Sequence, residues 1–230
     1  MKIIYLGHSS FILQTAMGRK ILIDPFKCAA IEKNLIGTVN LITVSHCHSN
    51  HNYTEPFKEN IKIIDAVGTY EDKDLRISGL PSFHDNINGL KRGENIIFLY
   101  EFDGFKICHL GDLGHIPDKE TLCSLKDLDI LLIPVGGNFT LDSKEACTLC
   151  NMISPKVIIP MHYKFMKDGF DIKGAEDFIF DMKNGERLSD SSLSLNFMPD
   201  CINAVFVMPP LQWLWLYLCK IKRTISQNVR

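Results

Sequence analysis

The sequence predicts an α+β fold in which two mixed β-sheets lie face to face with helices on their outer sides. The first half reads as a succession of short β-rich runs, and the second half alternates apolar strands with helices. No repeat, low-complexity segment or linker separates the two halves. With 230 residues, 46% of them hydrophobic, the chain can bury a full core as one domain built from two fused halves.

The first half is expected to open as a β-meander and to continue through further short strands. These strands are bounded by Gly, Pro, Asp or Asn and span residues 2–6, 11–14, 20–23, 39–44, 61–67, 75–81 and 96–102. Residues 25–37 should form a loop or a short helix, and residues 86–95 a polar loop. Asp103-Gly104 is typical of a two-residue hairpin turn, so residues 105–110 should pair antiparallel with the preceding strand.

The second half is expected to alternate helices with buried strands. The predicted helices span 117–125, 142–152 and 174–183, and the predicted strands 129–134, 156–160, 192–196 and 204–207. Asp142 or Ser143 can cap the second helix, and Glu145 completes a capping box if Asp142 is the cap.

The predicted boundaries are a single domain over residues 1–209, with halves of about 1–103 and 104–209, and an apolar and basic C-terminal extension over 210–230. The extension holds both tryptophans and ends in basic residues. Its apolar run is about half of the ~20 residues that cross a bilayer. Three interpretations stay open: a segment that docks on the body or on a second copy to form a homo-oligomer, an interfacial helix with aromatic anchors, and a disordered end.

Composition favours a small-molecule partner. A net charge of −2 gives no global field that would collect nucleic acid. The N-terminus begins as a strand and not as a secretory signal, so a cytoplasmic location is expected, with no transmembrane segment. The eight cysteines are scattered and should be reduced thiols.

Three histidines stand within six residues where the apolar run 39–44 ends. His46 and His48 alternate along an extended segment, so their side chains should share one side, with Cys47 packed on the opposite side. The turn should carry His51 to a neighbouring position. Because imidazoles bind divalent transition metals through one ring nitrogen, this cluster could serve one ion or two adjacent ions.

Other acidic and imidazole residues also follow predicted strands. They are Asp24, His84, Asp112 and His162. Side chains at strand ends can meet along one rim of a sandwich even when they are far apart in sequence. We therefore expect these residues to join the 46–51 cluster in a metal site.

The cluster His46-Cys47-His48-Ser49-Asn50-His51, followed by His84, Asp112 and His162, resembles the signature of the metallo-β-lactamase superfamily. Further similar stretches lie at 5–11, 23–26, 109–115, 133–137 and 159–163. Within the superfamily the chain is similar to small bacterial metal-dependent hydrolases that include ascorbate-6-phosphate lactonase. The resemblance implies an αββα sandwich with its site at one edge.

The resemblance also implies a set of ligands. His46, His48 and His84 would hold one ion, His51 and His162 a second, and Asp112 would bridge them. Asp24 would orient the histidine turn by hydrogen bonds from outside the ligand set. The family has Asp where this chain has Asn50, so the second ion loses a charged ligand and one or two ions are expected. Zinc is the expected metal, and manganese and iron also suit these ligands.

The implied reaction is hydrolysis of a small ester, lactone or phosphoester by a metal-bound hydroxide. The catalytic candidates are Asp112, Asn50 and His115, the last as a proton donor to the leaving group. His8 is expected to line the site, and Lys91 and Arg92 to pair with an anionic substrate group. The alternative is a catalytically weakened, ligand-binding relative whose second metal site is impaired by Asn50.

Overall fold

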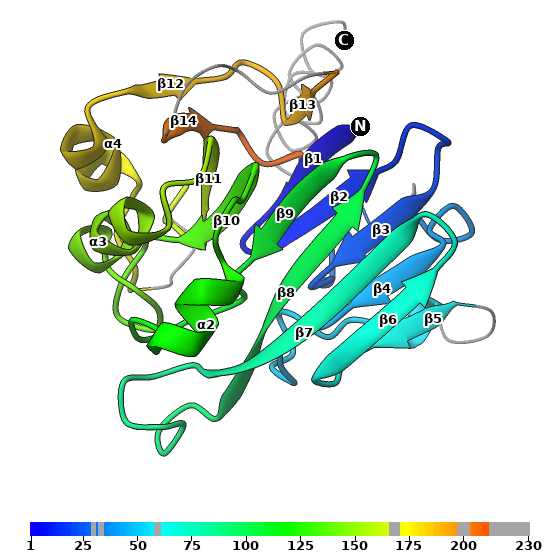
Figure 1. Ribbon diagram of the computed structural model, residues 1–230, viewed down its shortest axis with the longest axis horizontal. Coiled ribbons are helices and arrows are strands. Elements are labelled where there is room, and N and C mark those ends of the chain that lie inside the picture. Colours follow the sequence, from blue (N-terminus) through cyan, green and yellow to red (C-terminus); the bar gives the residue numbers. More distant parts are fainter. Residues whose placement is uncertain (29–30, 32–34, 58–60, 166–170, 197–202, 212–230) are drawn as a thin grey trace, which may run out of the picture.

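The computed structural model describes residues 1–28, 31, 35–57, 61–165, 171–196 and 203–211 (Figure 1). One sheet has six strands in the order β13-β1-β2-β3-β4-β5. Their bounds are β1 (Lys2–Gly7), β2 (Ser10–Gln14), β3 (Lys20–Ile23), β4 (Leu41–Thr43), β5 (Lys62–Ile64) and β13 (Ser192–Ser194). The first three strands form the predicted antiparallel meander, and β4 and β5 then add in parallel.

The second sheet has eight strands in the order β12-β14-β11-β10-β9-β8-β7-β6. Their bounds are β6 (Gly68–Asp72), β7 (Leu75–Phe83), β8 (Glu94–Phe102), β9 (Phe105–His109), β10 (Ile130–Pro134), β11 (Val157–Met161), β12 (Gly185–Arg187) and β14 (Ala204–Val207). From β6 to β9, each strand pairs antiparallel with the next. Neighbouring strands along the rest of the sheet, in the order β9-β10-β11-β14-β12, pair in parallel. Asp103 and Gly104, both with positive φ, make the predicted hairpin turn between β8 and β9.

The main core lies between the two sheets. Ile21 and Ile23 of β3 point into it, whereas Leu22 between them joins a second apolar cluster on the outer face of the six-stranded sheet. Cys28, Ile31 and other residues between 28 and 44 complete that outer cluster. The central strands β1 to β4 are therefore buried on both faces, which explains their continuous apolar runs.

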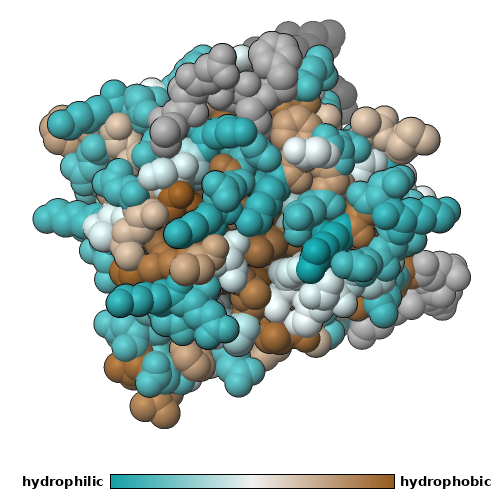
Figure 2. All heavy atoms as spheres, viewed as in Figure 1, coloured by the Kyte–Doolittle hydropathy of each residue, from teal (hydrophilic) through white to brown (hydrophobic). Residues whose placement is uncertain are grey.

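Three helices, α2 (Lys119–Ser124), α3 (Ser143–Ile153) and α4 (Glu176–Met182), lie together outside the eight-stranded sheet (Figure 1). Asp142 caps α3 and forms the predicted capping box with Glu145. None of the helices in the described part of the chain has the length and hydropathy needed to cross a bilayer. On the face shown in Figure 2, hydrophilic side chains surround smaller hydrophobic patches.

The sequence missed two strands and overextended several, chiefly those predicted at 39–44, 61–67 and 192–196. The predicted strand 61–67 ends at Ile64, and β6 and β12 were not predicted because their sequences, GTYED and GER, carry polar, mostly exposed side chains at sheet edges. Each sheet takes strands from both halves of the chain. The predicted loop or helix at 25–37 lies partly outside the described residues, and the C-terminal extension almost wholly so. None of the six cysteines in the described part of the chain is joined in a disulfide.

Candidate metal centre

The candidate site lies where strands from both sheets end. His8 follows β1, Asp24 follows β3, and the turn 46–51 begins three residues after β4. His84, Asp112 and His162 follow β7, β9 and β11. The structure therefore brings together every histidine and aspartate that the resemblance implies as a metal ligand.

Asp112 occupies the centre of the cluster and is 2% exposed. Its Oδ2 lies 3.2 Å from the Nε2 atoms of His51, His84 and His162, and 3.8 Å from that of His46. One carboxylate oxygen thus faces four imidazole nitrogens from three separate segments. The resemblance implies a bridging role for this residue.

The first group of candidate ligands is His46, His48 and His84, whose ligand atoms lie within 4.8 Å of one another. His46 Nδ1 is 2.9 Å from the Ser45 hydroxyl, whose proton goes to Asp24, so His46 Nδ1 is the donor. His84 Nδ1 likewise donates to the Phe139 carbonyl at 3.0 Å. Both rings therefore leave their Nε2 lone pairs for the site.

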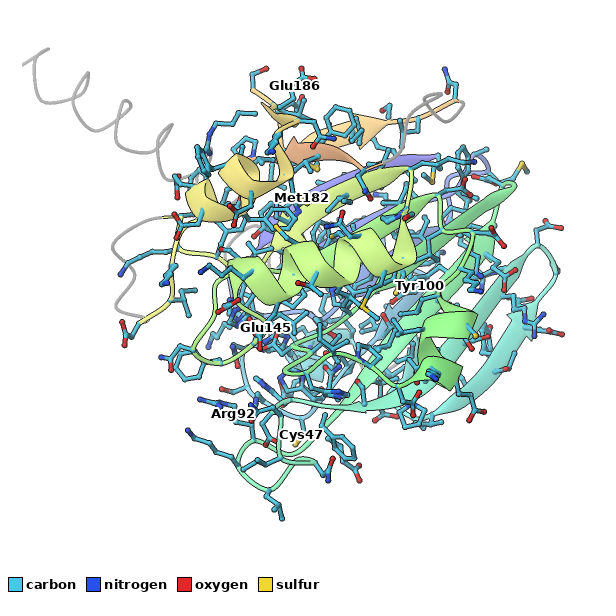
Figure 3. The ribbon with its side chains drawn as sticks, turned by 60° about the vertical axis from the view of Figure 1, so that its left-hand side comes forward. Cys47, Arg92, Tyr100, Glu145, Met182 and Glu186 are labelled. Carbon is cyan, nitrogen blue, oxygen red and sulfur yellow. The ribbon has the colours of Figure 1, made fainter. Side chains whose placement is uncertain are left out.

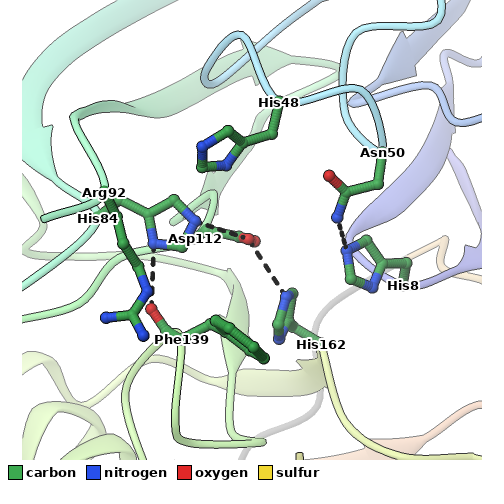
Figure 4. Close-up of a pocket in the computed structure, with 8 residues that line it drawn as sticks. All are labelled: His8, His48, Asn50, His84, Arg92, Asp112, Phe139 and His162. Carbon is green, nitrogen blue, oxygen red and sulfur yellow. Dashed lines mark hydrogen bonds and ion pairs between the residues drawn. The ribbon is translucent and has the colours of Figure 1, made fainter. Parts of the chain in front are cut away.

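The second group is His8, His51, Asp112 and His162, whose ligand atoms also lie within 4.8 Å of one another. His51 is fully buried and donates from Nδ1 to Asp24 at 3.0 Å, which turns its Nε2 toward Asp112. Asn50 lies beside this group, with its amide nitrogen 2.7 Å from His8 Nε2. Figure 4 shows Asn50 and His8 on the opposite side of the pocket from His84 and Arg92.

Asp24 lies outside these two groups and holds the histidine turn by hydrogen bonds. Its carboxylate accepts hydrogen bonds from the Ser45 backbone at 2.7 Å, from the Ser45 hydroxyl at 2.5 Å and from His51. Hydrogen bonds of this kind set the tautomer and the orientation of ligand imidazoles. Sequence reasoning missed Ser45, because a serine next to a histidine carries no signal until the fold places it on a carboxylate.

Three further residues that hold Asp112 were also missed. The Ser9 hydroxyl donates to Asp112 Oδ1 at 3.0 Å, and Asn95 accepts from the Asp112 backbone at 2.9 Å. Gly111, with φ of +58°, lies so close that an added Cβ would overlap the Asn95 carboxamide. Of these three residues, only Gly111, directly before Asp112, stands in a position that the sequence itself marks.

The two groups open into a cavity of about 310 Å³ that is also lined by Arg92 and Phe139. The Arg92 guanidinium lies 5.1 Å from the centre of the Phe139 ring. Its loop is held by Asp85, whose carboxylate accepts four backbone N–H groups between residues 87 and 92. These bonds outweigh the desolvation of Asp85 and lower its pKa to about 2. Lys91 is exposed and does not line the cavity.

Two side chains lie elsewhere than a place in the site would suggest. His115 is not among the residues that line the cavity: its Nε2 accepts from the Phe83 backbone at 3.2 Å and its Nδ1 donates to the Ile116 carbonyl. Its role as a proton donor stays a prediction. Cys47 is exposed instead of packed. In Figure 3 Cys47 and Arg92 lie at the same edge of the molecule.

The electrostatics of the cluster follow from burial and from two carboxylates. Burial opposes the charged form of His51, but Asp112 and Asp24 outweigh it and raise its pKa to about 10. Burial, reinforced by His51, lowers the pKa of His46 to about 3. His46 is therefore neutral and can offer its lone pair at neutral pH.

A divalent cation fits this arrangement. Among the described residues, His46 Nε2 has no hydrogen-bond partner although it is buried. His84 and His51 both donate from Nδ1, so a lone pair on Nε2 of either ring would face an acceptor oxygen of Asp112 at 3.2 Å, which is unfavourable unless a proton or a cation lies between them. Imidazole and carboxylate are ligands that zinc, manganese and iron accept.

A model of the beta-lactamase superfamily domain matches residues 2–162. The chain belongs to this superfamily. A metal-dependent hydrolase of Carboxydothermus hydrogenoformans is 31% identical over 199 residues, covering 71% of this chain and 84% of that protein. A crystal structure from Thermotoga maritima, assigned as a Zn-dependent hydrolase of the metallo-β-lactamase superfamily, shares 34% identity at a TM-score of 0.73 over 90% of this chain and 97% of its own.

An Ignicoccus hospitalis metallo hydrolase, 21% identical with a TM-score of 0.64 over 91% of this chain and 95% of its own, shares the fold. These findings confirm the predicted superfamily and its α+β sandwich, and they class the chain with the metal-dependent hydrolases of the superfamily. The nearer relation to ascorbate-6-phosphate lactonase stays a prediction.

Stability of this superfamily member should depend on pH once metal is removed. The folded protein keeps a proton on His51 up to about pH 10, whereas an unfolded histidine releases it near pH 6.5. The stabilisation is complete below pH 6.5 and is lost as pH rises, by about 1.4 kcal/mol per unit. Urea unfolding of chelator-treated protein between pH 6.5 and 7.5, which is below the titration of unfolded thiols near pH 8.5, should show this loss. His51→Gln should flatten it, and an unchanged slope would refute the assignment.

Proposed function

We propose that the chain hydrolyses a small anionic ester, lactone or phosphoester at the cluster around Asp112. The observation that carries this proposal is the single Asp112 oxygen 3.2 Å from three imidazole nitrogens, at the base of a cavity that Arg92 also lines. A cavity of about 310 Å³ is near the lower end of the usual ligand pockets, which favours a small substrate.

In this proposal His46, His48 and His84 hold one divalent cation, His51 and His162 contribute to a second, and Asp112 contacts both. A bound cation polarises the carbonyl or phosphoryl group and lowers the pKa of water from about 15.7 to about 7. Zinc is the proposed metal, with manganese and iron as the alternatives. The chain therefore needs no nucleophilic side chain of its own.

The protein residues then have three tasks. Asp24, Ser45 and Phe139 keep the ligand imidazoles in the tautomers that expose Nε2. Arg92 binds the anionic group of the substrate, and the hydrogen bonds to Asp85 hold its loop ready for this task. Phe139, beneath the guanidinium, limits the directions in which Arg92 can turn.

We expect Arg92→Ala to raise KM for an anionic substrate by about 10–100-fold, because a charge-assisted hydrogen bond contributes about 1.5–3 kcal/mol. The turnover number kcat should change less, and a neutral ester of the same size should show little change. Lys91→Ala is the matched control, since it removes a neighbouring exposed charge that does not line the cavity. Equal effects of the two substitutions on KM would contradict this role of Arg92.

The proposed activity is tested with protein that is stripped by chelator and reloaded separately with Zn²⁺, Mn²⁺ or Fe²⁺. Hydrolysis of a phosphodiester, a phosphomonoester or a lactone that depends on the added ion supports the proposal. Absence of turnover with all three ions, together with saturable binding of the same compounds, would favour the alternative of a ligand-binding relative. Asn50 is the residue that keeps this alternative open, because its amide carries no charge for the second ion.

A further inference from the structure

We propose that His8 is a ligand of the second ion and takes the position that a carboxylate at residue 50 fills in the superfamily signature. This inference rests on the proposed function, since it requires an ion held by His51, His162 and Asp112. It assigns a metal-binding role to a residue of the β1–β2 turn, outside the histidine motif.

The distances support His8 as the fourth member of a tetrahedral set. His8 Nε2 lies 3.1 Å from His51 Nε2, and Asp112 Oδ2 lies 3.2 Å from the Nε2 atoms of His51 and His162. Four ligand atoms at 2.0–2.1 Å from a tetrahedral ion are separated by about 3.3–3.4 Å. These three separations are close to that spacing, and all four ligand atoms lie within 4.8 Å of one another.

Asn50 does not fill this position in the structure. Its amide nitrogen, which is a hydrogen-bond donor, points at His8 Nε2 from 2.7 Å. A donor nitrogen offers no lone pair to a cation. An ion would compete with this amide for the lone pair of His8, so Asn50 acts on the site through His8.

The backbone of His8 is built to present the ring. His8 has a φ of +56°, a conformation that few residues other than glycine adopt and that often marks functional sites. Its carbonyl accepts hydrogen bonds from the His162 backbone at 2.8 Å and from the Tyr5 hydroxyl at 2.9 Å. The turn is thereby tied to another candidate ligand, and the His8 ring faces both His51 and His162, at centroid distances of 4.8 and 4.3 Å.

The test measures metal binding and not activity. His8→Asn suits the backbone, because Asn tolerates positive φ and its short side chain cannot reach the position of Nε2. Metal-free protein is titrated with Co²⁺ by visible absorption, and bound Zn²⁺ is counted by elemental analysis after dialysis. We expect two equivalents in the natural protein, and a second equivalent bound at least about tenfold more weakly in His8→Asn. Adding Asn50→Asp to His8→Asn should restore the affinity for the second equivalent.

His115→Gln is the control for loss of an imidazole outside the cavity and should keep both equivalents. Thermal unfolding of metal-free His8→Asn checks folding, and His8→Gly provides a second variant that accepts positive φ. If either folded variant binds two ions as tightly as the natural protein, His8 is not a ligand. One equivalent in both the natural protein and the variant would also overturn the inference. Binding of no ion by the natural protein would instead overturn the proposed function.

Discussion

Asp112→Asn is expected to remove both ions and to lower hydrolysis by more than about a hundredfold, since even partners outside the ligand shell contribute about 10–100-fold. The substitution keeps the shape of the side chain but removes the charge that faces four imidazole nitrogens. Elemental analysis of the purified variant and its rate with a substrate from the hydrolysis screen measure the two effects.

Ser9→Ala is the matched control for Asp112. It removes the hydrogen bond to Asp112 Oδ1 but leaves the carboxylate and its Oδ2 contacts in place. Ion binding should weaken by about tenfold or more without being lost. If Asp112→Asn retains two ions as firmly as Ser9→Ala does, Asp112 does not bridge the site.

Gly111→Ala is expected to lower the free energy of unfolding by about 3 kcal/mol or more, combining the cost of positive φ with that of overpacking. An added Cβ would overlap Asn95 Oδ1 and lie 2.8 Å from Ser45 Cβ, and both neighbours are buried. Because Asn95 holds the backbone of Asp112, the variant should also lose metal affinity. Urea unfolding measures the stability.

Gly104→Ala separates backbone strain from crowding. Gly104 has a φ of +77°, and nothing lies within 4 Å of an added Cβ. We expect it to cost about 1 kcal/mol and to leave metal binding unchanged. Equal losses for the two alanine variants would show that the contact of Gly111 with Asn95 does not constrain Asp112.

Much of the site could be predicted because its ligands follow strands. The apolar runs before His84, Asp112 and His162 are readable as strands, and their ends converge on one rim of the sandwich. The spacing of the histidine turn and the aspartate after Gly111 made the resemblance specific. These features depend on local sequence pattern, which is the information that a single sequence carries.

The rest depends on contacts between loops from different strands. Asn95, on strand β8, accepts a hydrogen bond from the backbone of Asp112, which follows the neighbouring strand β9. The carbonyl of Phe139 accepts a hydrogen bond from His84, which lies 55 residues away in the sequence. Neither position carries a pattern in the sequence. His115 is only three residues from Asp112, yet it does not line the cavity. Gly114 packs against the His84–Asp85 backbone, and the chain turns the His115 ring toward Phe83 and away from the cavity.

The most direct test of the metal centre is anomalous X-ray diffraction from crystals of protein purified without added metal or chelator, recorded at the zinc, iron and manganese edges. We expect a peak bounded by His46, His48, His84 and Asp112, and a second between Asp112, His51 and His162. Absence of any peak in this cluster, in crystals of protein that hydrolyses its substrate, would contradict a catalytic metal centre at this rim.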